Sequence, residues 1–470
     1  MLLCTMAAAH APSATTPQPR VVIAGAGLQG AALAYYLTQR GVRPLIVEAD
    51  RVAGAASGKG GGFLARDWGS GPTVQLHKLG FRLHAELAES LGIASYRRLP
   101  VLRVTPGPRT ARTVDICPWL DGEYVSNSDF MDKLGGAQVS PRELCEALVD
   151  RAVSAGAILR RGSVTGIVTD KAAFAAAPGA ADGVARADAR HGDGGEAGAR
   201  ARVTAVLVDG EAVPCSHFAV CMGPWAACAA EWFGCPLPMT GIKSTSVIFH
   251  PDPHHLPRPD PPGAAGASVQ AAAATAASAA AADAGATAGE PRVVQPFALF
   301  CGEDERHGTH LEVYPRANGD VYVCGIGGSE YVQGDELVAG RYPPGQVEAD
   351  PSRVDAAVLA LSSLSRTIAQ KPPIASQACM RPCPPDALPL MGRVPTVDGA
   401  FVSAGHNCWG ILWAPASGLA MSELIIDGEA SSLDLRPFDP ARFAPARTAN
   451  AGRAAKRGRK QGQAAVGEQW

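Results

Sequence analysis

The chain has 470 residues, 47% of them hydrophobic, which is enough for two or three domains with sizeable cores. Its 42 Lys and Arg residues nearly balance 44 Asp and Glu residues. The net charge of −2 excludes a nucleic-acid-binding protein with a large excess of positive charge. No run of about 18 uninterrupted apolar residues appears, so no transmembrane segment is expected.

The twelve cysteines are scattered, without a CxxC motif or a Cys/His cluster of zinc-site spacing, so we predict no metal site. They are typical of reduced, mostly buried thiols in an intracellular protein, and we expect a cytoplasmic location. Residues 1–19 lack acids and are rich in Ala, Ser, Thr and Pro. A disordered leader is predicted there, with an organellar transit peptide as the alternative.

The first ordered segment predicts a dinucleotide-binding turn. A buried parallel strand at 20–24 leads into Gly25, Gly27 and Gly30, whose spacing allows a sharp turn and a close backbone approach to a pyrophosphate. The helix that follows would direct its free N–H groups at the phosphates. A structural turn of the same shape is the alternative.

The same segment continues into a second strand that ends in an acid. Gly41 is placed to end the helix, and residues 45–47 form the strand. Glu48 lies 18 positions past Gly30, where a carboxylate is expected to accept hydrogen bonds from both ribose hydroxyls of an adenosine.

Further elements alternate along the chain. Ser140, Pro141 and Glu143 form a predicted capping box that opens a helix through Arg151. Residues 156–168 predict a strand pair around Gly162, and residues 217–222 predict another buried strand. Further predicted strands lie at 99–105, 243–250, 310–314 and 321–324 in a separate antiparallel sheet, and at 400–404 before a helix at 412–426.

Two segments and the end of the chain have biased compositions. Residues 171–202 are rich in Ala, Gly, Asp and Arg, and residues 251–291 are rich in Pro and then in Ala. Neither buries enough apolar surface to offset the entropy of ordering, so both are predicted to be flexible inserts. Residues 431–470 are predicted to be a basic disordered tail, with a nuclear address or a contact with anionic membrane as alternatives.

The resulting fold class is α/β, with a Rossmann-like nucleotide-binding domain interleaved with an antiparallel-sheet α+β substrate domain. After the leader, the first domain takes residues 20–95, 137–242 and 376–430, and the second takes residues 96–136 and 243–375.

The motifs together resemble the D-amino-acid oxidase, glycine oxidase and sarcosine oxidase family, and within it a eukaryotic branch of proposed FAD-dependent oxidoreductases. They are GAGLQG at 25–30, ASGKGGGFLARDW at 56–68, CMGPW at 221–225, EVYPRANGDVYVCG at 312–325, QACMRPCPPDALPLMG at 377–392 and GHNCWGILWAPASG at 405–418. The resemblance covers most of residues 20–430 outside the inserts, and it implies an FAD enzyme.

The resemblance implies which residues contact FAD. In the glycine turn they are Gly25, Gly27, Leu28, Gln29 and Gly30, and at the end of the second strand it is Glu48. Later in the chain they are Ser57, Gly58, Lys59, Val164, Gly223 and Trp225. Small residues in the second glycine-rich segment would let the backbone lie against the flavin, although a plain flexible loop is the alternative. Lys59 would place positive charge near the reduced flavin, or it is an exposed solubilising lysine.

A turn formed by Gly405, His406, Gly410, Ile411 and Leu412 enters the last helix, whose N–H groups would face the edge of the flavin that becomes negative on reduction. His406 has either a catalytic role or a structural one in this turn. Cys379 matches the position at which sarcosine oxidases attach FAD covalently, and an inert buried thiol is the alternative.

Arg381 matches the arginine that binds the substrate carboxylate in glycine and D-amino-acid oxidases. The alternative is a structural ion pair with Asp386. Cys408 stands where glycine oxidase has a second arginine, and Leu412 where sarcosine oxidase has a substrate-binding lysine, so the substrate class stays open.

The resemblance therefore implies an oxidase for a small amine or amino acid, which would be bound as the neutral amine and would give a hydride to the flavin, with molecular oxygen as acceptor. A dehydrogenase that passes electrons to a quinone or a carrier protein is the second hypothesis. A flavin-bearing regulatory or trafficking protein is the third, and an NAD-dependent dehydrogenase the weakest.

Overall fold

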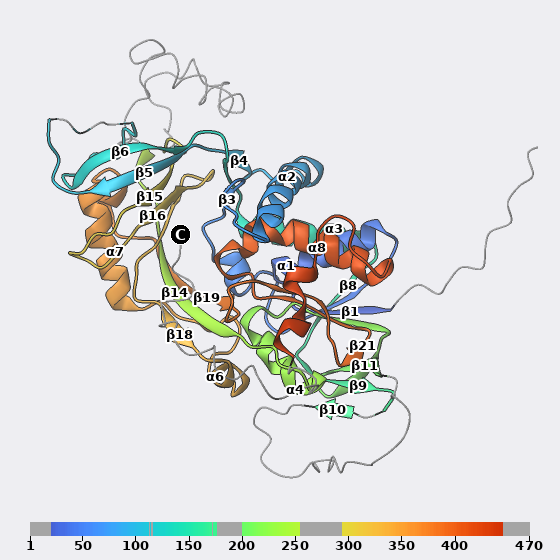
Figure 1. Ribbon diagram of the computed structural model, residues 1–470. Coiled ribbons are helices and arrows are strands. Elements are labelled where there is room, and N and C mark those ends of the chain that lie inside the picture. The colour runs from blue at the N-terminus through green and yellow to red at the C-terminus, as the bar shows by residue number, and fades with distance from the viewer. Residues whose placement is uncertain are drawn as a thin grey trace, which may run out of the picture.

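The computed structural model describes residues 20–111, 113, 116–171, 173–175, 200–253 and 294–444. The predictions for the leader, for most of the two inserts and for the end of the tail lie outside these residues. The described chain forms two regions side by side, one with helices clustered on a parallel sheet and one with a broad antiparallel sheet (Figure 1).

A six-stranded sheet is the centre of the first region. Its strands are β1 (Val21–Ala24), β2 (Leu45–Glu48), β8 (Ile158–Arg161), β13 (His217–Val220), β20 (Leu390–Arg393) and β22 (Ala400–Ala404). Their order is β20–β22–β13–β1–β2–β8, and all pairs are parallel except that of β20 with β22. Strands from the start, middle and end of the chain are therefore neighbours, which confirms the predicted interleaving.

Both faces of this sheet are covered, which explains why β1 is buried at every residue. Val21 and Ile23 pack against the helices α1 (Leu28–Gln39), α2 (Thr73–Leu91), α3 (Pro141–Ser154) and α8 (Gly410–Ile426). Val22 and Ala24 point to the other face, as the two-residue period of a strand requires, and pack towards a smaller sheet and α4 (Ala229–Phe233).

Small residues let the helices approach closely. A Cβ added at Gly418 of α8 would lie 2.6 Å from the carbonyl carbon of Ala32 in α1, and one at Gly80 of α2 would lie 2.2 Å from the Leu412 carbonyl oxygen. Among the described residues, one helix, Asn407–Ile426, is long and apolar enough to cross a membrane. Because most of it is buried within the protein, it is accounted for as a core helix.

The smaller sheet corrects one prediction. It contains β9 (Val164–Thr169), β10 (Ala173–Ala175), β11 (Ala201–Val208) and β12 (Glu211–Pro214), and β21 (Val397–Asp398) pairs with β11. The two strands predicted around Gly162 exist as β8 and β9, but they do not pair with each other. β8 lies parallel to β2, whereas β9 pairs with β11, so Gly162 marks the passage between two sheets.

The second region is built on the predicted antiparallel sheet, which we call the cap sheet. It contains β5 (Val101–Pro106), β6 (Val125–Asp132), β14 (Thr240–Phe249), β15 (Ala298–Cys301), β16 (Glu312–Pro315), β17 (Val321–Cys324), β18 (Glu330–Val332) and β19 (Ala375–Cys383). Its one parallel pair is β15 with β5. Helix α7 (Pro351–Leu364) covers one face, and the other face is turned towards the first region (Figure 1).

Shorter elements connect the two regions. They are β3 (Phe63–Ala65), β4 (Arg97–Arg98), β7 (Gly136–Gln138) and α6 (Gly334–Val338). At the start of α3, the Ser140 hydroxyl accepts a hydrogen bond from the Glu143 N–H, as predicted. The Glu143 carboxylate, however, accepts from the N–H groups of Ala94 and Ser95, so the second half of the predicted capping box is absent.

Part of the predicted tail is folded. Two short 3-10 helices lie at Arg436–Phe438 and Pro440–Phe443, and the Phe438 side chain is fully buried. Arg442 forms an ion pair with Asp386 at 2.7 Å. The rest of the predicted tail lies outside the described residues.

Candidate active site

One long cavity lies between the carboxyl ends of the parallel strands and the inner face of the cap sheet. Its floor comes from the turns after β1, β2 and β13, and its roof from β14, β16, β17 and β19. The turn that enters α8 closes one side. A crevice beyond the carboxyl ends of parallel strands is the usual ligand site of this kind of fold.

The turn after β1 accepts only glycine at its critical positions. Gly25 has φ +102°, and a Cβ added there would lie 2.6 Å from the Cys221 carbonyl oxygen. A Cβ at Gly30 would lie 1.9 Å from the Gly25 carbonyl oxygen. The predicted tight turn is thus present, and its backbone is open to a ligand at Gly27.

The N-terminus of α1 offers N–H donors to an anion. The Leu28 N–H donates to the Ser57 hydroxyl oxygen at 2.9 Å, which ties the two glycine-rich segments together. Among the described residues, the N–H groups of Gly27 and Gln29 have no acceptor. Such orphan donors at the positive end of a helix suit a phosphate group.

Glu48 lies at the end of β2, beside this turn. Its carboxylate accepts hydrogen bonds from the Ala26 N–H at 2.7 Å and the Asp50 N–H at 2.9 Å. Each oxygen keeps a lone pair for a further donor, such as a ribose hydroxyl. Gly162 and Val164 line the adjoining part of the cavity, where the adenosine end was predicted.

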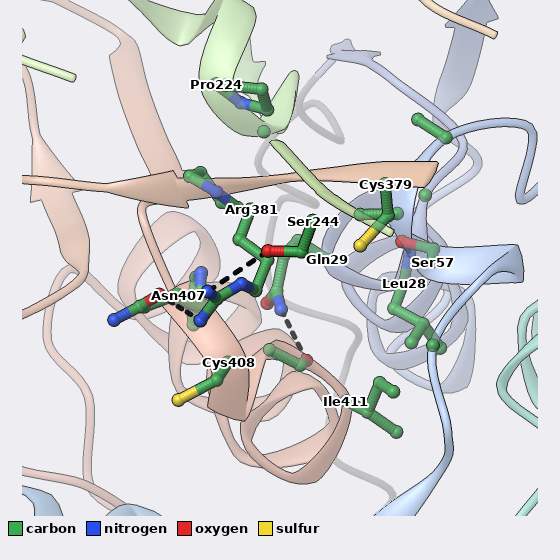
Figure 2. A pocket seen from close by; sticks show the side chains of 18 of the residues that line it. Leu28, Gln29, Ser57, Pro224, Ser244, Cys379, Arg381, Asn407, Cys408 and Ile411 are labelled. Carbon is green, nitrogen blue, oxygen red and sulfur yellow. Dashed lines mark hydrogen bonds between the residues drawn. The ribbon is translucent and has the colours of Figure 1, made fainter. Parts of the chain in front are cut away.

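At the other end, two buried acceptors lie near the start of α8. The Gln29 Nε2 group donates to the Gly410 carbonyl oxygen at 2.9 Å (Figure 2), whereas its Oε1 has no partner among the described residues. His406 Nδ1 is also buried without one. A buried polar atom without a partner is costly, so both atoms suit a site in which a bound polar ring provides the missing hydrogen bonds.

Most of the predicted cofactor residues line the cavity. They are Gly25, Gly27, Leu28, Gln29, Glu48, Ser57, Val164, Gly223, Trp225, Cys379, Gly405, His406, Gly410 and Ile411. Gly30, Gly58, Lys59 and Leu412 do not line it, and their predicted contacts with FAD stay predictions. Gly30, Gly58 and Leu412 serve packing: a Cβ at Gly58 would lie 2.1 Å from the Ala53 carbonyl oxygen, and the Leu412 side chain is fully buried.

Lys59 is held by hydrogen bonds of its ammonium and of its backbone. Its ammonium donates to the Ala378 carbonyl oxygen at 2.9 Å and the Val347 carbonyl oxygen at 3.3 Å. Its own carbonyl oxygen accepts from Gln377 Nε2 at 2.7 Å. Burial lowers the pKa of this ammonium. Lys59 therefore links the second glycine-rich segment to β19.

His406 is held by a hydrogen-bond chain. Ser417 donates its hydroxyl to the Trp413 carbonyl oxygen, so we assign the hydrogen of His406 to Nε2, which lies 3.0 Å from the Ser417 oxygen. Burial lowers the pKa of His406 to about 3. A group that stays neutral at physiological pH is unsuited to carry protons there, so the structural role is favoured.

Arg381 extends from β19 into the cavity (Figure 2). Its guanidinium donates to the Asn407 Oδ1 atom at 3.3 Å and to the Ser244 hydroxyl at 3.2 Å. Asp386 is paired with Arg442 instead, so the alternative ion pair is wrong. Asn407 itself has φ +45°, an uncommon backbone conformation for a non-glycine residue that often marks a functional turn.

Several cavity residues were not predicted. Ser244 and Asn407 hold Arg381, and the cap sheet adds Glu312, Tyr314, Tyr322 and Cys324. The two-residue period of β16 and β17 places these four side chains on one face, a signal that was available in the sequence. All eleven described cysteines are free, and among the described residues no cluster of His, Cys, Asp or Glu could hold a metal ion.

The sequence profile of one protein family, described as FAD dependent oxidoreductase, matches residues 20–424. The chain belongs to this family. FAD is therefore its cofactor and redox chemistry its activity, and the turn after β1, Glu48 and the start of α8 provide the donors and acceptors that such a cofactor needs.

Related proteins include two yeast proteins named as proposed oxidoreductases. The chain is 24% identical to C1F5.03c of Schizosaccharomyces pombe over 89% of this chain and 97% of the relative. It is 33% identical to TDA3 of Saccharomyces cerevisiae over 154 residues, which span 32% of this chain and only 28% of that protein.

Solved structures share the fold. Glycine oxidase of Geobacillus kaustophilus superimposes with a TM-score of 0.62 at 20% identity, covering 92% of this chain and 100% of that one. An L-amino acid deaminase of Proteus myxofaciens, in complex with anthranilate, also gives 0.62 at 16% identity, with 92% and 95% coverage. At such identities the likeness establishes the architecture alone.

Proposed function

We propose that this FAD-dependent oxidoreductase oxidises the C–N bond of a small amino acid or amine, with molecular oxygen as the final acceptor. The observation that carries the proposal is Arg381, a cation that lines the cavity opposite the floor of the FAD-binding region. An arginine at the roof of a flavin cavity is suited to a substrate with a carboxylate.

Arg381 would fix the orientation of the substrate. A guanidinium binds a carboxylate with two parallel hydrogen bonds, which restrict its rotation as well as its position. Ser244 on β14 and Asn407 in the turn before α8 hold the guanidinium from two sides, so little side-chain entropy remains to be lost on binding. The carbon that carries the amine is then presented to the floor of the cavity.

When bound, FAD supplies the hydride acceptor and the route for electrons to oxygen. The chain provides a dry environment for this step through Tyr314, Tyr322, Trp409 and Phe63, whose rings line the same cavity. The positive end of α8 stabilises the negative charge that accumulates during the reaction.

The first experiment is a substrate screen on the purified, FAD-loaded protein. Amino acids and N-methyl amines are supplied in air, and hydrogen peroxide is measured with a coupled peroxidase. We expect peroxide with at least one of them. If substrates reduce an artificial quinone but give no peroxide, the acceptor is not oxygen. If no amine or amino acid reacts with either acceptor, the proposed C–N oxidation is wrong.

A further inference from the structure

We propose that Glu312 binds the amine end of the substrate, so that the cavity selects a molecule with both a carboxylate and an amine over a simple amine or a simple acid. This inference rests on the proposed function and extends it to the substrate class. Arg381 would hold one end of that molecule, and Glu312 the other.

The register of the cap sheet places Glu312 on the cavity face. In the antiparallel pair of β16 with β17, Glu312 lies opposite Cys324, and Tyr314 lies opposite Tyr322. Side chains two residues apart on a strand share a face, and all four of these line the cavity. Val313 and Val323 point the other way, into the core that α7 covers.

The carboxylate of Glu312 is only partly satisfied by the protein. Its Oε2 atom accepts hydrogen bonds from the Tyr314 hydroxyl and from the Cys324 thiol at 3.4 Å. Among the described residues, none donates to Oε1 and none forms an ion pair with Glu312. Only 7% of the residue is exposed, and burial raises the pKa of its carboxyl group.

The second oxygen of Glu312 is available to a ligand, because the residue lines the cavity. A buried carboxylate needs either a cation or a full set of hydrogen bonds, and Glu312 has two donors on one oxygen. An amine supplies what is missing, because its N–H groups donate to a carboxylate oxygen whether the nitrogen is neutral or charged. A substrate hydroxyl would supply only a single, weaker donor.

Arg381 and Glu312 line the same cavity from two strands of the cap sheet. Their strands are separated by β14 and β17, because β14 pairs with β19 on one side and with β17 on the other. Three strand spacings of ~4.8 Å across the sheet, together with an offset of about four residues of ~3.3 Å along the strands, put the two backbones roughly 20 Å apart. Both side chains lie on the cavity face and shorten this gap, and the Arg381 charge lowers the pKa of Glu312 against the larger effect of burial.

The test compares three ligands of one shape on the FAD-loaded protein. 2-Aminoisobutyrate has both groups, 2-hydroxyisobutyrate lacks the amine, and tert-butylamine lacks the carboxylate. None has a hydrogen on the carbon that would be oxidised, so dissociation constants can be measured by calorimetry or by flavin absorbance without turnover. We expect 2-aminoisobutyrate to bind at least about tenfold more tightly than either analogue, the size of one charge-assisted hydrogen bond.

The variant Glu312→Gln should remove this preference and leave the affinity for 2-hydroxyisobutyrate unchanged within about twofold. Glu330→Gln, which removes a carboxylate from β18 of the same sheet, is the matched control and should keep the preference. If Glu312→Gln does not retain FAD, Glu312→Asp replaces it, with an expected selective loss of several-fold for 2-aminoisobutyrate.

The inference is overturned if the wild-type protein shows no preference, or if the preference survives in Glu312→Gln. In both cases the proposed function stands as long as the carboxylate ligands bind and require Arg381. If none of the three ligands binds and the substrate screen is also negative, the proposed function falls, and the inference falls with it.

Discussion

Replacing Arg381 with glutamine is the perturbation whose effect follows most directly from the geometry. The guanidinium is held by Asn407 and Ser244 beside the cavity. Glutamine has neither its positive charge nor its pair of parallel N–H donors. A bidentate pair loses at least one and at most two charge-assisted hydrogen bonds, each about 1.5–3 kcal/mol. The expected loss in kcat/KM for a carboxylate substrate is therefore roughly 10- to 10⁴-fold.

The assay measures kcat/KM with the best substrate from the screen, together with the dissociation constant of 2-hydroxyisobutyrate. Both should change in Arg381→Gln, whereas FAD content and melting temperature should stay close to the wild-type values. Arg442→Gln is the matched control, because Arg442 pairs with Asp386 away from the cavity. The reasoning is refuted if Arg381→Gln binds the acid as well as the wild type does, or if its only effect is loss of FAD.

Three further predictions concern the cofactor turn, the link to the cap sheet and the response to acid. Gly30→Ala should abolish FAD retention, because the added Cβ would lie 1.9 Å from the Gly25 carbonyl oxygen. The control Gly302→Ala should retain FAD, because the nearest atom to its Cβ would be 3.3 Å away. Equal FAD content in the two proteins would contradict this prediction. Lys59→Met should lower the melting temperature with little effect on the rate of flavin reduction, since the ammonium binds the carbonyl oxygens of Ala378 and Val347. A large loss in that rate at unchanged melting temperature would instead indicate a catalytic role for Lys59. Burial lowers the pKa of His84 to about 4 and of His406 to about 3. Because the unfolded chain takes up these protons first, the free energy of unfolding should fall as the pH drops from about 6.5 to 4, by up to about 1.4 kcal/mol per pH unit for each histidine; urea titrations check this, and a flat profile in that window would disprove it.

The parts of the fold that local signals determine were predictable from the sequence. The glycines after β1, the acid at the end of β2 and the proline at the start of α3 each act on the few residues around them. The strands β17 and β22 have the predicted limits, because their apolar runs end at turn residues. In these cases the cause and the structure lie in the same short segment.

Errors arose where the partner is distant in the sequence. β8 and β9 were expected to pair because they are adjacent in the chain, but their partners, β2 and β11, come from elsewhere. The carbonyl oxygens that bind the Lys59 ammonium are 288 and 319 residues away. Nothing in a small-residue loop reveals such contacts, so the hydrogen bonds that link Lys59 to distant segments were not predicted.

The site itself was predictable in its cofactor half and less so in its substrate half. The family motifs supplied the turn after β1, the start of α8 and Arg381, whose neighbours Ser244 and Asn407 are 137 and 26 positions away. Glu312 needed the register of β16 with β17, and the position of both strands relative to β19, before it could be recognised as part of the cavity.

The most direct test of the whole account is anaerobic reduction of the bound flavin. The FAD-loaded protein is mixed with the amino-acid and N-methyl-amine panel without oxygen, and the absorbance of the oxidised flavin is followed in the wild type and in Arg381→Gln. We expect at least one carboxylate-bearing amine to bleach the wild type, and to bleach the variant at least about tenfold more slowly. If dithionite bleaches the flavin but no amine or amino acid does, the proposed chemistry is contradicted.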